Sequence, residues 1–268
     1  MPKPMLEDID LIATDMDGTL LDVATKEVPS STFPLIRELC DRGILFFAAS
    51  GRQYPSLRRL FGPVVDEIGY VCENGALALH LGEVLFKKTF PRDIALDICH
   101  AVMERPDCNL AVSGERVTYV LDSDAAFAAH MENVVRNDVV MIARPEDIDE
   151  PIVKICFQLP SGERASAEAH FSDILPAGFH VAASGNTWLD IVQDGADKGS
   201  ALHEVGKRLG IPVSRMMAFG DESNDAEMLD TVGHPMLMAS GNPSLRGLND
   251  RIRLCESVES ELSRLLGR

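Results

Sequence analysis

The sequence predicts an α/β fold: a Rossmann-like parallel sheet core with helices on both faces, plus an inserted α+β domain. Three observations support this prediction. Short apolar segments ending in polar clusters alternate with helical segments near both ends of the chain, as in parallel sheets built from β-α-β units. The middle of the chain instead shows a hairpin and shorter strand-like runs. A length of 268 residues is enough for one large domain or two modest ones.

The amino-terminal segment carries the first alternating elements. A short apolar run bounded by polar residues is typical of a buried strand, whereas apolar residues three and four apart are typical of a helix. Gly43 follows one such helical pattern and marks its end. The predicted elements are, in order, a strand at 9–14, a helix at 31–42, a strand at 44–49, a short helix at 56–61 and a strand at 70–72.

The pattern changes near Leu81, where strand-like runs at 76–81 and 83–90 flank Gly82 like a hairpin. The next predicted elements are strands at 110–112, 117–121, 139–143 and 152–159, and helices at 91–104, 124–135 and 163–175. Alternation then resumes with a strand at 188–192, a helix at 198–209, a strand at 215–219, a helix starting near Asn224 and a strand at 236–238. We therefore expect a core domain of residues 1–81 and 186–268 and an inserted domain of residues 82–185.

Composition restricts the function classes. Hydrophobic residues make up 46% of the chain and charged residues 25%, an ordinary globular balance. The formal net charge of −17 repels polyanions, so we expect no nucleic-acid partner. The same charge repels an anionic substrate. A phosphate site in this protein therefore needs local positive charge from a cation, from Lys or Arg, and from backbone N–H groups.

Cysteine spacing and hydropathy indicate the compartment. The six cysteines include no Cys-x-x-Cys pair, and we expect reduced thiols, not a disulfide framework or a zinc site. No signal-peptide pattern begins the chain, and no apolar run approaches the roughly 20 residues that span a bilayer. These features predict a cytoplasmic protein with no membrane partner. They leave the oligomeric state open.

Asp15 and Asp17 end the first predicted strand within an Asp-Met-Asp-Gly-Thr sequence. Residues two apart on a strand face the same way. Two carboxylates so placed can share a divalent cation, or one can attack as a nucleophile while the other handles protons. Gly18 allows the chain to turn sharply away. The alternative is an ordinary strand end followed by an Asp-Gly turn, and this sequence alone does not decide between them.

Three further clusters lie beside predicted strand ends or helix starts. Ser50, Gly51 and Arg52 offer a hydroxyl, a close backbone approach and a cation for phosphoryl oxygens; the alternative is an ordinary βα turn. Lys198 occupies a predicted first helical turn, where the helix dipole disfavours a cation; the alternative is a solvated surface lysine. The third cluster is Gly220-Asp221-Glu222-Ser223-Asn224-Asp225. It places acidic side chains at a helix start, suited to a hard cation or to a helix cap.

Taken in this order, the four clusters resemble the haloacid dehalogenase superfamily. The resemblance covers nearly the whole chain, and the long insertion between Ser50 and Lys198 resembles the Cof-type branch, which carries a large α/β cap. Glu73-Asn74-Gly75 and Leu189-Asp190-Ile191 are secondary matches. Glu222 departs from the pattern, because the family usually has a smaller or uncharged residue there, and its effect on metal preference is left open.

The resemblance implies a magnesium-dependent phosphatase with an aspartyl-phosphate intermediate. Asp15 is then the nucleophile and Asp17 the general acid and base. Mg²⁺ is held by the Asp15 carboxylate, the Asp17 carbonyl and Asp221, with Asp225 orienting this set. Ser50 and Lys198 stabilise phosphoryl oxygens, and the further phosphate contacts are Gly51, Arg52, Asn74 and Asn224.

The substrate implied is a small phosphomonoester, such as a sugar phosphate or a phosphorylated cofactor, but the cap gives no motif that identifies it. Hinges near Leu81-Gly82 and Ser184-Gly185 are expected to let the cap close. Two alternatives remain: a phosphomutase that uses the same intermediate, and a phosphate-binding regulator without catalysis.

Overall fold

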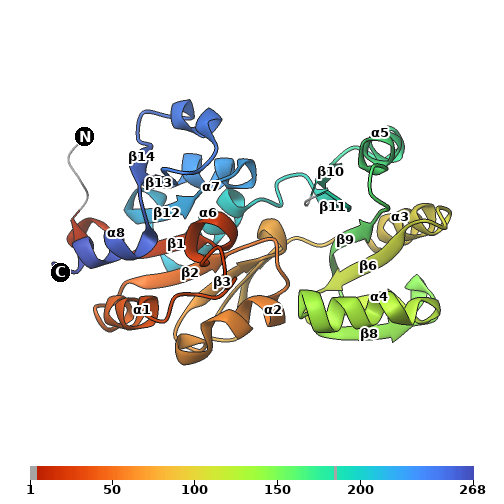
Figure 1. Ribbon diagram of the computed structural model, residues 1–268, viewed down its shortest axis with the longest axis horizontal. Coiled ribbons are helices and arrows are strands. Elements are labelled where there is room, and N and C mark those ends of the chain that lie inside the picture. The colour runs from red at the N-terminus through yellow and green to blue at the C-terminus, as the bar shows by residue number, and fades with distance from the viewer. Residues whose placement is uncertain (1–4, 184–185) are drawn as a thin grey trace. The chain divides into compact units, whose positions relative to one another are not determined.

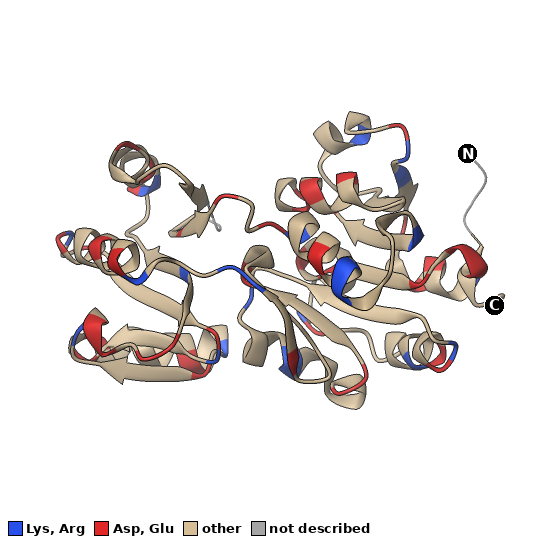
Figure 2. Ribbon diagram, turned by 180° about the vertical axis from the view of Figure 1, so that it is seen from behind, with Lys and Arg blue, Asp and Glu red and all other residues tan. Residues whose placement is uncertain are grey.

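The computed structural model describes residues 5–183 and 186–268 (Figure 1). Contacts between residues divide the chain into two compact units. We call Met1–Lys87 with Asp197–Arg268 the core unit, and Lys88–Ala196 the inserted unit. Within the described residues, no helix is both long and apolar enough to cross a membrane. Asp and Glu outnumber Lys and Arg by 42 to 25, and the red segments of the ribbon in Figure 2 show acidic residues on many elements of both units.

The core unit is built on an eight-stranded sheet with the order β14-β13-β12-β1-β2-β3-β4-β5. Its strands are β1 (Leu11–Asp15), β2 (Leu45–Ala49), β3 (Gly69–Cys72), β4 (Leu77–His80), β5 (Glu83–Lys87), β12 (Met216–Gly220), β13 (His234–Met238) and β14 (Arg253–Cys255). The strands from β14 to β3 pair in parallel, whereas β4 and β5 pair antiparallel. The parallel part of this sheet confirms the predicted α/β class.

Helices cover both faces of this sheet. They are α1 (Thr32–Asp41), α2 (Tyr54–Arg58), α6 (Lys198–Leu209), α7 (Ala226–Thr231) and α8 (Val258–Leu265). Consecutive strand residues point to opposite faces. Ile12 accordingly packs in a cluster with Leu39 of α1 and Leu262 of α8, whereas Ala13 packs in a second cluster with Leu202 of α6. Burial on both faces explains why these strands are continuous apolar runs in the sequence.

The inserted unit has its own six-stranded sheet, with the order β10-β11-β9-β6-β7-β8. The strands are β6 (Asn109–Gly114), β7 (Thr118–Leu121), β8 (Val139–Ile142), β9 (Ile152–Gln158), β10 (Phe179–Ala183) and β11 (Trp188–Gln193). All pairs are antiparallel except β7 with β8. One face packs against α3 (Arg92–Met103) and α5 (Arg164–Ile174), and the other packs against α4 (Ala125–His130). This is the α+β insertion that the sequence predicts.

Both domain boundaries in the structure differ from the predicted ones, as the strand pairing shows. β5, expected in the insertion, pairs with β4 in the core sheet. β11, expected to return the chain to the core, pairs with β9 and β10 in the inserted unit. The units therefore meet at 87–88 and 196–197 instead of 81–82 and 185–186. The sequence also gave no prediction of β10, β14 or α8.

The sequence predicts two hinges between the units, and the structure describes only one of these segments. Leu81 and Gly82 form the turn between β4 and β5 inside the core unit, and both have positive φ values, 52° and 79°. A tight hairpin turn within one sheet does not connect the two units. Ser184 and Gly185 lie outside the described residues.

Candidate active site

Four neighbouring parallel strands bring the predicted residues to one edge of the core sheet. β12, β1, β2 and β3 are adjacent, and they run in parallel. Asp15 is the last residue of β1 and is registered against Ala49, the last residue of β2. Ser50 and Asp221 directly follow β2 and β12. Carboxyl ends of parallel strands form the usual ligand crevice of such sheets.

Lys198 joins two buried carboxylates. Its Nζ lies 2.5 Å from Oδ1 of Asp15 and 2.6 Å from Oδ1 of Asp225. Lys198 and Asp225 are 1% and 0% exposed. Asp197 caps the same helix by accepting a hydrogen bond from the Ser200 N–H. The lysine of the first helical turn is therefore not the solvated side chain that the alternative assumed.

Asp225 uses both carboxylate oxygens within the protein. Oδ1 accepts from Lys198, and Oδ2 accepts from the backbone N–H groups of Asp221 and Glu222 at 2.9 and 3.1 Å. These bonds fix the loop between β12 and α7. Asp225 is thus well placed to orient Asp221.

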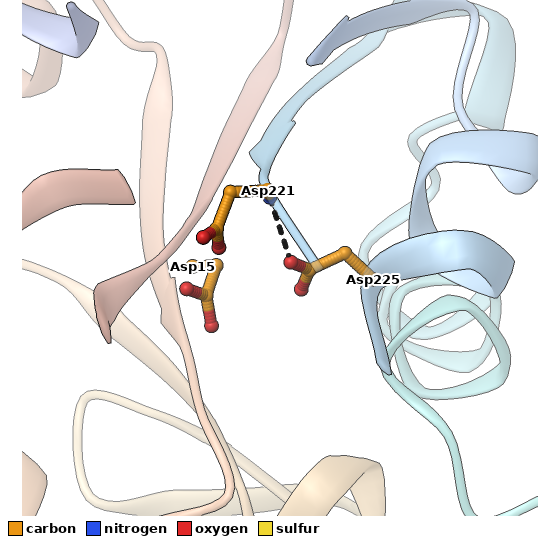
Figure 3. Close-up of side chains that lie close together, drawn as sticks. All are labelled: Asp15, Asp221 and Asp225. Carbon is orange, nitrogen blue, oxygen red and sulfur yellow. Dashed lines mark hydrogen bonds between the residues drawn. The ribbon is translucent and has the colours of Figure 1, made fainter. Parts of the chain in front are cut away.

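Three carboxylates converge beside Lys198. Asp15, Asp221 and Asp225 each offer an oxygen, and these oxygens lie within 4.8 Å of one another; Figure 3 shows Asp15 and Asp221 side by side, with Asp225 bonded to the Asp221 backbone. Among the described residues, this is the group suited to hold a metal ion. Carboxylate oxygens are the ligands that hard cations prefer.

Burial and mutual repulsion act on this cluster. Burial raises the pKa of Asp15 to about 7, with a further rise from Asp225 and an opposing effect of Lys198. Burial and the charge of Asp225 raise the pKa of Asp221 to about 6. Burial by itself lowers the pKa of Lys198, but the carboxylates of Asp15 and Asp225 outweigh it and the net shift is upward. The cluster has more negative charge than one lysine neutralises.

Thr19 and Gly18 complete the pocket around Asp221. The Thr19 hydroxyl donates to Asp221 Oδ1 at 3.1 Å. Gly18 has φ +88°, and a Cβ on it would lie 2.1 Å from Asp221 Oδ2. Glycine at this position therefore serves both the turn and the space that Asp221 needs. The role of Thr19 was not predicted, although the residue belongs to the Asp-Met-Asp-Gly-Thr motif.

Asp17 and Arg52 form an ion pair at the surface of the site. Arg52 Nη2 donates to both oxygens of Asp17, at 2.9 and 3.0 Å. Both side chains are partly exposed, 53% for Asp17 and 31% for Arg52. Arg52, predicted as a phosphate contact, thus binds a protein carboxylate in this structure. The Asp17 carboxylate lies outside the three-carboxylate group.

The loops after β2 and β3 are bonded together. The Asn74 N–H donates to the Ser50 carbonyl at 3.1 Å, and the buried Ser50 hydroxyl accepts from the Arg52 N–H at 3.3 Å. A Cβ on Gly51 would lie 2.7 Å from Oδ1 of Asn74. These contacts bring Ser50, Gly51 and Asn74 to one place, as the strand pattern predicts.

Two residues of the last cluster, Glu222 and Asn224, are exposed. Asn224 is exposed in the turn Ser223–Asp225. Glu222 accepts hydrogen bonds from the Asn242 side chain and the Ser223 N–H, at 3.2 and 3.3 Å. The extra carboxylate is therefore turned toward Asn242, and it is absent from the three-carboxylate group. No sequence signal marked Asn242.

The sequence is similar to a known protein family and to named enzymes. A sequence model of the family described as haloacid dehalogenase-like hydrolase matches residues 12–257. The chain is 26% identical over 242 residues to the Escherichia coli enzyme named 5-amino-6-(5-phospho-D-ribitylamino)uracil phosphatase, covering 88% of each chain. It is 27% identical over 259 residues to the HMP-PP phosphatase of Serratia proteamaculans, covering 94% of this chain and 91% of that one.

Solved structures agree with the fold. A protein from Streptococcus mutans is 25% identical, with a TM-score of 0.81, 97% of this chain covered and 100% of the other. A protein from Eubacterium rectale is 24% identical, with a TM-score of 0.85 and coverage of 96% and 99%. Both likenesses extend over the core unit and the inserted unit.

Proposed function

Because this chain belongs to the haloacid dehalogenase-like hydrolase family, we propose that it is a magnesium-dependent phosphatase of small phosphorylated metabolites. Its curated relatives are named phosphatases. The observation that carries the proposal is the buried contact of Lys198 with Asp15, beside Asp221. A nucleophile, a cation for phosphoryl oxygens and a site for a metal thus lie within one group of side chains.

The donor set fits a magnesium ion. The cluster offers hard oxygen ligands. Burial, with the added charge of Asp225, raises the pKa values of Asp15 and Asp221, and a bound cation would favour their ionised forms. Both oxygens of Asp225 are already bonded, which leaves Asp15, Asp221 and the Asp17 backbone carbonyl as the ligands that we propose. The bound ion would polarise the phosphoryl group and offset its negative charge.

Asp15 acts as the nucleophile in the first step. One carboxylate oxygen forms a bond to phosphorus while the bond from phosphorus to the substrate oxygen breaks. That oxygen leaves with the electron pair and takes a proton from Asp17. The products of this step are the dephosphorylated alcohol and an aspartyl-phosphate on Asp15.

Water completes the turnover. Asp17, now ionised, removes a proton from a water molecule whose oxygen attacks phosphorus. The bond from phosphorus to Asp15 breaks, inorganic phosphate leaves, and both carboxyl groups return to their starting states. Arg52 holds the Asp17 carboxylate through two of its N–H groups, which restricts its position for both proton transfers.

Several groups bind the phosphoryl oxygens in this proposal. Lys198 and the Ser50 hydroxyl stabilise the charge that spreads over these oxygens in the transition state. The Gly51 backbone is proposed as a further phosphate contact, and the absence of a side chain on Gly51 lets Asn74 approach this loop closely. Asn74 and Asn224 are proposed as further contacts, with Asn224 exposed to solvent.

The inserted unit serves as the cap in this proposal. It has its own sheet and apolar core, so it can change position without unfolding. We propose that it selects the alcohol part of the substrate, and that the substrate is a small phosphorylated metabolite such as a sugar phosphate or a phosphorylated cofactor. A cytoplasmic location is part of the proposal, and its reducing environment would keep cysteines as thiols.

Phosphate release from a generic aryl phosphate tests the proposal. Turnover is expected with Mg²⁺, and it should disappear on chelation or on Asp15→Asn. The matched control is Asp173→Asn, which neutralises an exposed carboxylate on α5 of the inserted unit. If Asp15→Asn turns over at the wild-type rate, Asp15 is not the nucleophile. Isomerisation of a sugar phosphate without phosphate release would instead identify a mutase.

A further inference from the structure

One edge of the inserted unit's sheet is exposed and apolar. β8 is the last strand in the order β10-β11-β9-β6-β7-β8, and no strand among the described residues pairs with its outer side (Figure 1). Its residues are Val-Val-Met-Ile, and Val140 and Met141 are 40% and 53% exposed. Proteins usually protect such an edge with charges, proline, a bulge or a covering element, because it is a template for another strand.

The other sheet edges in the described residues are protected differently. β5 begins with Glu83 and ends with Lys87, and the three-residue strand β14 begins with Arg253. β10 carries the polar side chain of His180, whose Nδ1 lies 2.8 Å from Oδ1 of Asp194. Edge charges and short length both discourage pairing. The four residues of β8 are all apolar, so among the edge strands of the described residues it is the one without a polar side chain.

The direction of the backbone groups shows which residues can pair outward. The Thr118 N–H donates to the Asp138 carbonyl at 2.8 Å, and Thr118 is registered against Val139. Successive residues of a strand direct their N–H and C=O groups to opposite sides. Asp138, Val140 and Ile142 therefore bond toward β7, whereas Val139 and Met141 present theirs at the open edge.

We propose that this edge pairs with β8 of a second copy of the chain. In an antiparallel arrangement about a two-fold axis, Met141 faces Met141 of the other copy, and the two exchange N–H···O bonds. Val139 then faces Ala143, the next outward position. A register shifted by one residue would oppose outward-facing Val139 to inward-facing Ile142 and lose these bonds.

Charge supports the same register. With Met141 on the axis, Asp138 of each copy lies opposite Arg144 of the other, and both side chains are exposed. Opposite charges on directly facing residues stabilise antiparallel pairs. Arg144 binds Asp147 in the single chain at 3.1 Å, but exposed ion pairs are weak and exchange readily. The sequence of this edge is therefore complementary to itself, which favours a second copy over an unrelated strand.

Sedimentation equilibrium of the whole chain tests the proposal. The wild type is expected to show a monomer–dimer equilibrium. Met141→Lys should raise the dissociation constant at least about tenfold, because it places two lysines beside each other on the axis. Leu254→Lys is the matched control, since Leu254 is 50% exposed on β14 at the edge of the other sheet. It should leave the dissociation constant unchanged.

A charge exchange identifies the register. Asp138→Arg and Arg144→Asp should each weaken the dimer several-fold, and the double variant should restore it. Thermal melts of every variant show whether the fold is kept, and the exchange remains decisive if Met141→Lys alters stability. A monomeric wild type would overturn the proposal, as would a dimer that Met141→Lys leaves intact or a double variant weaker than both single ones.

Discussion

Arg52 donates hydrogen bonds to both carboxylate oxygens of Asp17. Nη2 lies 2.9 and 3.0 Å from them, and Nε donates to Oδ2 at 3.2 Å. The residues are 35 positions apart, but they follow β1 and β2, which pair in parallel with Asp15 registered against Ala49. Sheet register therefore creates the pair. A guanidinium bound in this way has a rigid, planar geometry that fixes the carboxylate.

Replacing Arg52 separates a positioning role from a binding role. Arg52→Ala is expected to lower kcat about 10- to 100-fold with little change in KM, since Asp17 would lose its fixed orientation for proton transfer. The kcat of Arg52→Lys should lie between those of the wild type and Arg52→Ala, because an ammonium group keeps the charge but cannot make the planar bidentate contact. Arg42→Ala, on the exposed end of α1, is the control. A rise in KM at constant kcat would show that Arg52 binds substrate instead.

Lys198 is expected to be as important for folding as for activity. Lys198→Met leaves Asp15 and Asp225 buried without their cation, and breaking such a group costs about 3–5 kcal/mol. Urea denaturation near neutral pH should show this loss, and the loss should shrink in acid, where the carboxylates can take up protons. Lys207→Met on the same helix, an exposed lysine paired with Glu204, should change stability by less than about 1 kcal/mol. Equal stabilities of the two variants would contradict the structural role.

The local sequence pattern was sufficient to predict the strands that carry the site residues. The segments 9–14, 44–49 and 215–219 are mainly apolar because both faces of the sheet are covered, and each is followed by a polar cluster. Parallel strands necessarily bring such clusters to one edge. For this reason Asp15 and Asp221 could be placed together from the sequence.

Long-range pairing was beyond the same pattern. The middle of the segment 188–193 is buried, and its pattern would look the same in either sheet. Only its bonds to β9 and β10 assign it to the inserted unit. Arg52 was likewise a cation near an anion site, with no local signal that Asp17 is its partner. Contacts between residues far apart in sequence decide both cases.

Alanine substitutions at two glycines with similar backbone angles can distinguish backbone strain from a steric clash with a neighbouring side chain. Gly18 and Gly43 have φ +88° and +81°, so alanine is strained at either position, by roughly 1–2 kcal/mol. At Gly18 the new Cβ would also lie 2.1 Å from Asp221 Oδ2, whereas at Gly43 nothing lies within 4 Å. Gly18→Ala must therefore displace Asp221, and we expect turnover to fall about 100-fold.

Steady-state kinetics and magnesium titration of the two variants check this. Gly43→Ala should keep wild-type turnover and magnesium affinity despite a lower melting temperature. Gly18→Ala should need more Mg²⁺ to reach its reduced maximum rate. Equal activities would mean that the loop relaxes around the methyl group without moving Asp221.

Protons and magnesium are expected to compete for Asp15 and Asp221. Their pKa values rise from 3.8 to about 7 and about 6 in the folded protein without metal. Between about pH 4 and pH 7 the folded state therefore binds more protons than the unfolded state. It follows that these two groups stabilise the metal-free protein most in acid, and that their contribution is lost as the pH rises through 6 and 7.

Magnesium at the proposed site should reverse this trend, because it would bind the ionised carboxylates and exclude their protons. The rise in melting temperature caused by Mg²⁺ is expected to be small near pH 5 and to grow up to about pH 8. Melting curves with Mg²⁺ or with a chelator, taken across this range, measure it. Asp15→Asn removes the carboxyl group with the larger pKa shift, so it should flatten the pH dependence of the magnesium effect on melting temperature near pH 7. Asp173→Asn on α5 should leave this pH dependence unchanged. A magnesium effect of the same size at every pH would mean that the ion binds away from Asp15 and Asp221.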